Sequence, residues 1–271
     1  MSGTGFIAAL PMYHFPETAA ANDALWAAIA ASLRAQEIDA PVRLTRSGAL
    51  EAQWRDARLL LGQTCGFPYV KDLQGSAALV ATPHYAFPGC AGATHRSFII
   101  ARQDDKRRSL AQFRGARAAV NGWTSNSGMN LFRAAIAPLA AGRPFFDEVS
   151  VTGSHAASVD AVANDRADIA AIDCVAFALM ERAHPKRAAR VAVVAETISS
   201  PCLPFIASAR LPPQTIAAVR EALLMALTEP SLAEAREMLG LCGASPATPT
   251  DYDRVLEIER EAESAGYPRL A

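Results

Sequence analysis

The sequence has no excess of charge of either sign. Its 271 residues include 26 Lys and Arg and 27 Asp and Glu, for a net charge of −1. A basic surface that would bind nucleic acid or an anionic membrane is therefore not expected. Long apolar runs are also missing, because the richest stretch, residues 169–180, is shorter than the roughly 18 apolar residues of a membrane-spanning helix. We expect neither nucleic-acid binding nor membrane insertion.

Cysteines are few and scattered, at positions 65, 90, 174, 202 and 242. There is no CxxC pair and no spacing typical of metal ligands, so we expect reduced thiols and neither a metal nor a cofactor. Residues 1–5 carry no basic stretch, and residues 6–10 are too short for the apolar core of a signal peptide. The sequence as written therefore predicts a cytoplasmic protein, or a periplasmic one if the true N-terminus lies upstream.

The chain does contain a regular alternation of strand and helix patterns. In its middle, apolar runs at 117–121, 148–152, 168–172 and 190–195 alternate with helical patterns at 129–139, 155–164 and 174–182. Before them we expect strands at 6–10, 42–45, 59–61, 78–81 and 97–102, helices at 19–35 and 48–54, and a surface loop at 84–95. After them we expect a strand at 205–208 and helices at 213–227, 231–239 and 252–265. This order predicts an α/β fold with mostly parallel sheets flanked by helices.

Two uncharged polar loops lie between a strand and a helix in this middle region. The first contains Trp123, Thr124, Ser125, Asn126 and Ser127, and the second contains Ser154 and His155. A helix N-terminus presents free N–H groups and the positive end of the helix dipole, so both loops could bind an anion. The alternative is that their hydroxyl and amide groups only cap the helices and that His155 is solvated. Neighbouring strands would direct both loops to one point, which favours the anion site.

Further candidates follow other strands. Asp173 ends a buried strand, where its carboxylate could bind a ligand, orient His155 or cap the next helix. In the first hundred residues, Tyr13 and the loop with Thr64, Cys65 and Tyr69 could line the same ligand site. A nucleophilic Cys65 would need a base and a lowered pKa, and nothing nearby in the sequence provides either. We find no convincing catalytic set and do not expect an enzyme.

Several segments, in order, resemble the substrate-binding proteins of phosphate, phosphite and phosphonate ABC transporters. These are HRSFIIAR at 95–102, SLAQFRG at 109–115, SNSG at 125–128, TGSH at 152–155 and the stretch from Ala161 to Asp168. The resemblance implies the type 2 periplasmic-binding-protein fold, with residues 1–101 in lobe 1, 102–196 in lobe 2 and 197–271 returning to lobe 1. It also implies a small anion held in the cleft between the lobes by Ser125, Asn126, Ser127 and His155. An ABC transporter permease is an expected partner, and a monomer or dimer the expected state.

The chain departs from this family pattern at the serine loop. Asn126 replaces the central Thr, and Trp123 adds bulk just before it, which suggests a larger or less charged ligand than phosphonate. One alternative is a cytoplasmic enzyme on the same fold, acting on a small carboxylate or pyrimidine-like metabolite. Another is a soluble sensor.

Overall fold

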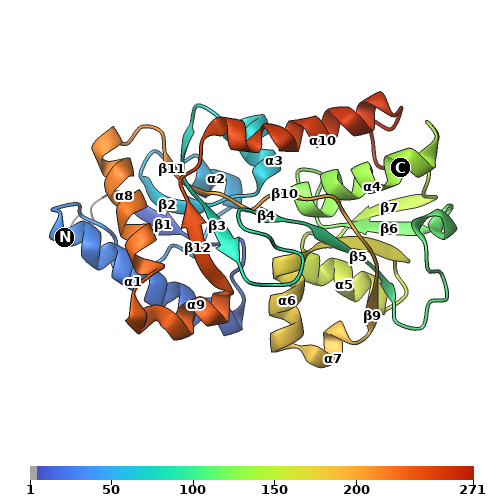
Figure 1. Cartoon of the computed structure of the whole chain (residues 1–271), viewed down its shortest axis with the longest axis horizontal. Coiled ribbons are helices and arrows are strands. Elements are labelled where there is room, and N and C mark those ends of the chain that lie inside the picture. The colour runs from blue at the N-terminus through green and yellow to red at the C-terminus, as the bar shows by residue number, and fades with distance from the viewer. Residues whose placement is uncertain (1–4) are drawn as a thin grey trace. The chain divides into compact units, whose positions relative to one another are not determined.

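The computed structural model describes residues 5–271 and contains two compact units, each built on its own five-stranded sheet (Figure 1). Unit 1 comprises the described residues up to Ala86, Ala91–Ala93 and Pro201–Tyr252. Unit 2 comprises Phe87–Cys90, Thr94–Ser200 and Asp253–Ala271. Residues 1–4, which belong to the stretch examined for a signal peptide, lie outside the described residues.

The sheet of unit 1 has the strand order β1-β2-β11-β3-β12. The strands are β1 (Ile7–Ala9), β2 (Leu59–Gln63), β11 (Phe205–Ser208), β3 (Ala77–Tyr85) and β12 (Leu241–Ser245). Its helices are α1 (Ala19–Ala35), α2 (Leu50–Trp54), α3 (Gly66–Pro68), α8 (Pro213–Ala226) and α9 (Ala233–Leu239). Every residue of β2 is buried, as expected for a strand covered on both faces. Leu25, Trp26, Ile29 and Leu33 form the buried stripe of α1.

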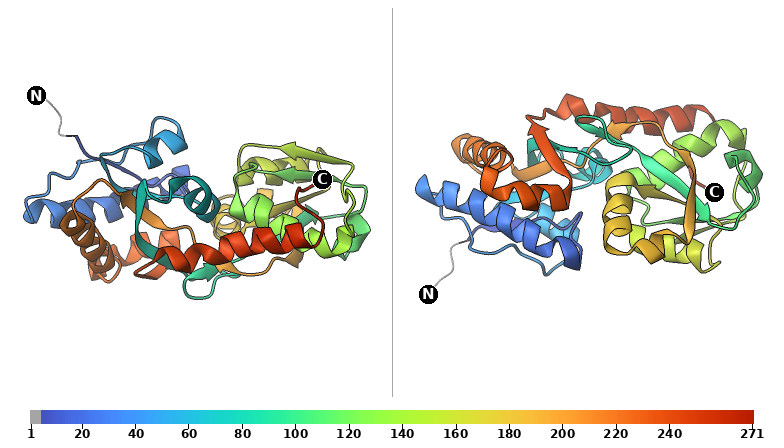
Figure 2. Two further views of the ribbon diagram at one scale, coloured as in Figure 1. Left: turned by 90° about the horizontal axis from the view of Figure 1, so that it is seen from above. Right: turned by 60° about the horizontal axis from the view of Figure 1, so that its bottom comes forward.

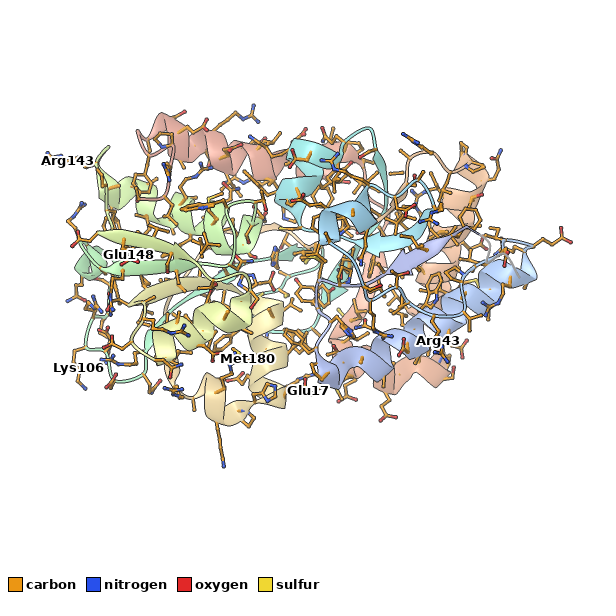
Figure 3. The ribbon with its side chains drawn as sticks, turned by 180° about the vertical axis from the view of Figure 1, so that it is seen from behind. Glu17, Arg43, Lys106, Arg143, Glu148 and Met180 are labelled. Atoms are coloured by element: carbon orange, nitrogen blue, oxygen red, sulfur yellow. The ribbon has the colours of Figure 1, made fainter. Side chains whose placement is uncertain are left out.

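The sheet of unit 2 has the order β7-β6-β8-β5-β9. The strands are β7 (Glu148–Val151), β6 (Arg117–Val120), β8 (Ile169–Asp173), β5 (Ser97–Arg102) and β9 (Val191–Glu196). Its helices are α4 (Leu131–Ala140), α5 (His155–Ala163), α6 (Cys174–Ala183), α7 (Pro185–Ala188) and α10 (Asp253–Ser264). Glu148 lies exposed on the edge strand β7, whereas every residue of β8 is buried (Figure 3).

Short elements connect these parts. They are η1 (Pro16–Thr18), η2 (Tyr69–Leu73), η3 (Leu110–Phe113), η4 (Asn126–Asn130), η5 (Pro230–Leu232), η6 (Pro249–Tyr252), β4 (Thr94–His95) and β10 (Ser200–Pro201). Strands β4 and β10 form a separate two-stranded sheet. Within residues 5–271, no helix has both the length and the apolar character that a membrane span requires.

The predicted α/β class with two lobes is confirmed, but three local expectations are wrong. The sheets are mixed, because β11 and β12 run antiparallel to β3, and β5 runs antiparallel to β8 and β9. Residues 42–45 form no strand. The expected surface loop at 84–95 is partly ordered structure, because β3 continues to Tyr85 and the fully buried His95 belongs to β4.

The division of the chain also differs from the predicted lobe limits. Strand β5, placed by the prediction largely in lobe 1, pairs with β8 and β9 in unit 2. Residues 253–271 belong to unit 2, because α10 lies along α4 (Figure 2). There the Nδ2 of Asn130 donates to the Val255 carbonyl (3.1 Å) and the Nη1 of Arg133 to that of Pro268 (2.7 Å). The apolar periodicity of α10 predicts a helix but does not indicate which unit it covers.

Candidate functional site

The parallel strands β6, β7 and β8 end at one edge of the unit 2 sheet, and each leads into a helix. In α/β proteins this carboxyl edge is where ligands bind. A polar side chain caps each helix. Ser125 Oγ accepts from Gly128 N (2.9 Å), Ser154 Oγ from Ala157 N (3.1 Å), and Asp173 Oδ1 from Val175 N (2.9 Å) and Ala176 N (3.1 Å). The capping alternative therefore holds for these three residues.

Ser127 and His155 join the two polar loops. The Ser127 Oγ lies 3.0 Å from Nε2 of His155, so the loops meet as the order of the strands predicts. Ser127 is buried, and its carbonyl oxygen accepts from the Ser97 hydroxyl (2.9 Å), which fixes the loop against β5. Burial lowers the pKa of His155, although the charge of Asp173 opposes the effect. A neutral imidazole can exchange the donor and acceptor roles with the Ser127 hydroxyl, or turn a donor toward an anion.

Asn126 is committed to a buried amide network. Its Nδ2 donates to Ser200 Oγ (2.8 Å), and its Oδ1 accepts from Asn130 Nδ2 (3.1 Å). Asn130 in turn accepts from Arg133 (2.9 Å). The residue that departs from the family pattern therefore holds the serine loop in place, through an amide that donates to Ser200 and accepts from Asn130.

Asp173 pairs with His95 in the interior of unit 2. The His95 Nδ1 lies 3.1 Å from Asp173 Oδ2, and both side chains are buried. Burial alone would lower the pKa of His95, but the charge of Asp173 and the hydrogen bond to it outweigh burial and raise this pKa to about 10. The pKa of Asp173 is lowered, because the attraction and the hydrogen bond of His95 exceed the cost of burial. Asp173 thus carries two structural roles.

His95 is the residue that the sequence interpretation missed. The sequence predicts a surface loop at this position, yet His95 is fully buried beside the carboxyl edge of β8. The one available signal is its position at the start of the motif of residues 95–102, next to a buried strand, where a polar residue can enter the core only with a partner.

Position 128 requires a glycine, because neighbouring side chains lie very close to its Cα. A Cβ at this position would lie 1.9 Å from Asn121 Oδ1 and 3.2 Å from a ring carbon of His155. We expect Gly128→Ala to displace both side chains and to lower the free energy of unfolding by about 1–3 kcal/mol in a urea titration. Gly122→Ala in the same loop is the matched control, because no atom lies within 4 Å of its added Cβ. Equal stability of the two variants would contradict the close packing.

Trp123 and Thr124 form the exposed part of the serine loop. The Trp123 side chain is 40% exposed, and the Arg269 guanidinium lies 5.7 Å from its ring centroid. These two side chains are more exposed than those of Ser125, Asn126 and Ser127.

The predicted residues from the first hundred positions all belong to unit 1 and are buried there. Tyr13 packs edge-on against Tyr85, with ring centroids 5.4 Å apart. Tyr69 makes the same contact with Tyr252, also at 5.4 Å, and burial raises the pKa of Tyr69. Thr64 and Cys65 lie between β2 and α3, where the Thr64 hydroxyl faces the Cys65 carbonyl at 3.4 Å. Their packing accounts for these four residues without a ligand, so their binding role stays a prediction.

One group of described side chains has the donor types of a metal site. Donor atoms of His95, Asp173 and Cys174 all lie within 4.8 Å of one another. A metal ion there would have to break the ion pair between His95 and the Oδ2 atom of Asp173. The Oδ1 atom of Asp173 already caps α6. His95 and Asp173 already form a buried ion pair, and we assign no metal to the group.

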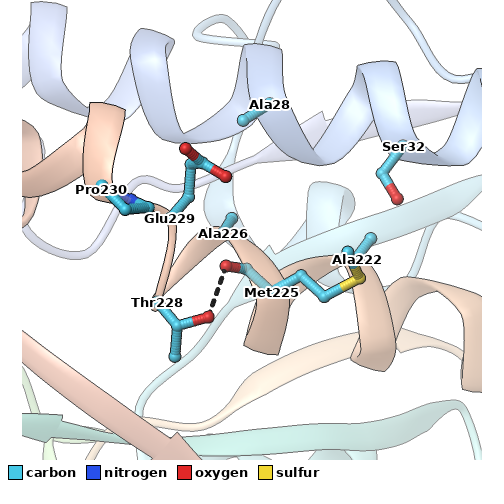
Figure 4. A pocket seen from close by; sticks show the side chains of 8 residues that line it. All are labelled: Ala28, Ser32, Ala222, Met225, Ala226, Thr228, Glu229 and Pro230. Carbon is cyan, nitrogen blue, oxygen red and sulfur yellow. Dashed lines mark hydrogen bonds between the residues drawn. The ribbon is translucent and has the colours of Figure 1, made fainter.

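Unit 1 contains a surface hollow of about 380 Å³ beside α1 and the end of α8 (Figure 4). It is lined by Ala28, Ser32, Ala222, Met225, Ala226, Thr228, Glu229 and Pro230. The Thr228 hydroxyl donates a hydrogen bond to the Met225 carbonyl (3.0 Å), and the Glu229 carboxylate would repel an anion. None of the predicted binding residues lines this hollow.

The fold and the polar edge of unit 2 define a binding protein of the type 2 periplasmic class. The sequence matches, over residues 7–252, the family model of the periplasmic substrate-binding proteins of phosphonate ABC transporters, and the chain belongs to this family. The family binds a substrate for a transporter, so the predictions of a solute-binding function and of no enzyme activity are confirmed. No curated protein matches the chain in sequence.

Solved structures share the fold at low sequence identity. A binding component of a phosphonate ABC transporter from Pseudomonas aeruginosa has a TM-score of 0.77 at 14% identity, covering 96% of this chain and 87% of that one. A phosphonate-binding protein from Prochlorococcus marinus in complex with methylphosphonate has a TM-score of 0.75 at 14% identity, covering 95% and 98%. A protein from Xanthomonas citri bound to chloride ion has a TM-score of 0.72 at 17% identity, covering 97% and 99%.

Proposed function

We propose that the chain binds a phosphonate or a related small oxyanion at the carboxyl edge of the unit 2 sheet, with Ser127 and His155 as donors. The observation that supports this most is the 3.0 Å contact between Ser127 Oγ and His155 Nε2, which joins the loops after β6 and β7. Both residues stand at a helix N-terminus, whose dipole favours negative charge. The neighbouring Asp173 is neutralised by His95, so its charge does not oppose an anion as an unpaired carboxylate would.

The proposal separates residues that shape the site from residues that contact ligand. Ser125, Ser154 and Asp173 cap helices, and Asn126 holds the loop through Ser200. Trp123 and Thr124 are exposed on the same loop. We infer that they contact the organic substituent of the ligand, which makes a phosphonate larger than methylphosphonate the favoured class.

We also infer the setting in which the protein works. Its family consists of periplasmic binding components of ABC transporters, which supports a periplasmic location and delivery of the ligand to a permease. A monomer or dimer is the expected state, and size-exclusion chromatography with light scattering measures it.

A thermal-shift series tests the ligand class. The compounds are methylphosphonate, a phosphonate with an aromatic substituent, inorganic phosphate, methanesulfonate and an aminopyrimidine. A ligand at about 100 times its Kd stabilises the folded chain by about 2.7 kcal/mol, which corresponds to a rise in Tm of about 5–10 °C for a protein of this size. We expect this rise for at least one phosphonate, and a larger one for the aromatic compound at equal concentration. A flat response to all the anions contradicts the proposed class, and a rise with the aminopyrimidine alone reassigns it.

A further inference from the structure

Two cysteine thiols of unit 2 lie in contact although they are far apart in sequence. The Sγ atoms of Cys90 and Cys174 are 3.4 Å apart. Cys174 is the first residue of α6 and is fully buried, whereas Cys90 is only half-buried.

Backbone contacts hold this pair together. Gly89 has a φ of +88°, and its carbonyl oxygen accepts from Arg96 N (3.1 Å), while the Arg96 carbonyl accepts from Cys174 N (3.2 Å). A Cβ on Gly89 would lie 2.9 Å from the Cβ of Cys174, so the segment before Cys90 rests directly on the start of α6. At the other end of the segment, the guanidinium of Arg182, also on α6, stacks over the Phe87 ring at 4.6 Å.

We propose that Cys90 and Cys174 form an intramolecular disulfide, which fastens segment Phe87–Cys90 to the N-terminus of α6. A disulfide needs an S–S distance of about 2.05 Å, so the sulfur atoms must approach by about 1.4 Å. Rotation of the half-buried Cys90 side chain can supply much of this movement, since Cys174 is confined by Gly89. The family is periplasmic, and disulfides form and persist in that compartment. The proposal replaces the expectation of reduced thiols that the scattered cysteine positions suggested.

The chemistry assigns the two thiols different roles. The more accessible Cys90 thiolate attacks a small disulfide such as oxidised glutathione, which forms a mixed disulfide and releases one small thiol. Cys174 then loses its proton to solvent, attacks the Cys90 sulfur and expels the second small thiol. Two protein thiols are oxidised and one small disulfide is reduced to two thiols. The hydrogen bond with Cys90 and burial raise the pKa of Cys174, in keeping with a thiol that reacts second.

The disulfide would restrain the buried centre of unit 2. Cys174 directly follows Asp173, which caps α6 and pairs with His95, and His95 follows the fastened segment in the chain. Joining positions 90 and 174 closes a loop of 84 residues and restricts the unfolded chain. We therefore expect the oxidised protein to be more stable than the reduced protein.

The test compares the full chain treated with oxidised glutathione or with dithiothreitol. After unfolding, we expect five free thiols in the reduced protein and three in the oxidised one, with a 90–174 linked peptide in the tryptic digest. Oxidation is expected to raise Tm by about 5–10 °C. Cys242→Ser, which removes an exposed thiol, should keep the linked peptide and the shift.

Cys90→Ser is expected to lose both the linked peptide and the shift in Tm. Its Tm under reducing conditions shows that the variant folds, so a lost shift is not mistaken for a lost fold. The proposal is overturned if the oxidised protein retains five thiols, carries glutathione stably on Cys90, or links Cys90 to a cysteine other than Cys174.

Discussion

Replacing Asp173 with alanine is expected to lower the free energy of unfolding by about 3–5 kcal/mol, because removing one partner of a buried ion pair leaves the other without compensation. Nδ1 of His95 lies 3.1 Å from this carboxylate, and no other carboxylate is recorded in an ion pair with His95 among residues 5–271. The variant also loses the two backbone hydrogen bonds that cap α6. Urea denaturation at pH 6, followed by circular dichroism, measures the change.

Two comparison variants separate these contributions. Asp173→Asn keeps an oxygen that can cap α6 but removes the charge, so the difference between the two variants measures the cap. Asp104→Ala removes an exposed carboxylate that pairs with Arg102, and it should change stability little because exposed pairs are screened by solvent. A loss at Asp173→Ala no larger than that at Asp104→Ala would mean that the buried pair contributes nothing to stability.

The same pair predicts a dependence on pH. The pKa of His95 rises from its ordinary value of 6.5 to about 10 on folding, so its stabilising effect is complete below pH 6.5 and is lost as the pH rises to about 10. The pKa of Asp173 falls below its ordinary value of 3.8, so its effect is present above that pH and is lost in stronger acid. The difference in stability between wild type and Asp173→Ala should therefore be largest between about pH 4 and 6.5. A difference that stays constant up to pH 10 would contradict the charged pair.

Ser127→Glu is expected to weaken phosphonate binding by at least a hundredfold. The added carboxylate would stand beside His155 at the proposed anion position, and two like charges about 4 Å apart repel by about 4 kcal/mol at the effective dielectric constant of a protein surface. Isothermal titration calorimetry with the phosphonate that gives the largest thermal shift measures the loss. Binding that survives this change would place the anion elsewhere.

Ser127 is buried, so the fold of this variant needs its own control. Ser127→Ala removes the hydroxyl without adding charge or volume, and it should weaken binding by only about tenfold through the loss of one hydrogen bond. Ser47→Glu introduces the same carboxylate at an exposed position of unit 1 and should leave the affinity unchanged. A comparable loss in Ser47→Glu would attribute the effect to net charge and not to the proposed site.

The part of the site that could be predicted follows from local order along the chain. Strands β6 and β7 are each followed at once by a polar loop and a helix, and parallel strands carry such loops to one edge of the sheet. This order of elements predicts that Ser127 and His155 lie close together, as they do. His95 could not be placed in the same way, because its partner Asp173 belongs to another strand and only tertiary packing brings the two into contact.

The fold shows the same limit. The apolar run of β5 indicates a strand but not its direction, which depends on pairing with β8 and β9. The periodicity of α10 indicates an amphipathic helix but not the surface it covers. Contacts between distant segments, including that of Cys90 with Cys174, lie outside what spacing in one sequence can predict.

The position of α10 in unit 2 sets an order in which the two units can be completed during synthesis. The last strand of the unit 2 sheet ends at Glu196, but the carbonyl groups that Asn130 and Arg133 bind come from Val255 and Pro268. The ribosome must therefore make Pro201–Tyr252, the closing part of unit 1, before unit 2 receives its last helix. Unit 2 spends that interval with part of α4 uncovered, so it is the unit completed last, and its nascent form is exposed to aggregation or to a chaperone until then.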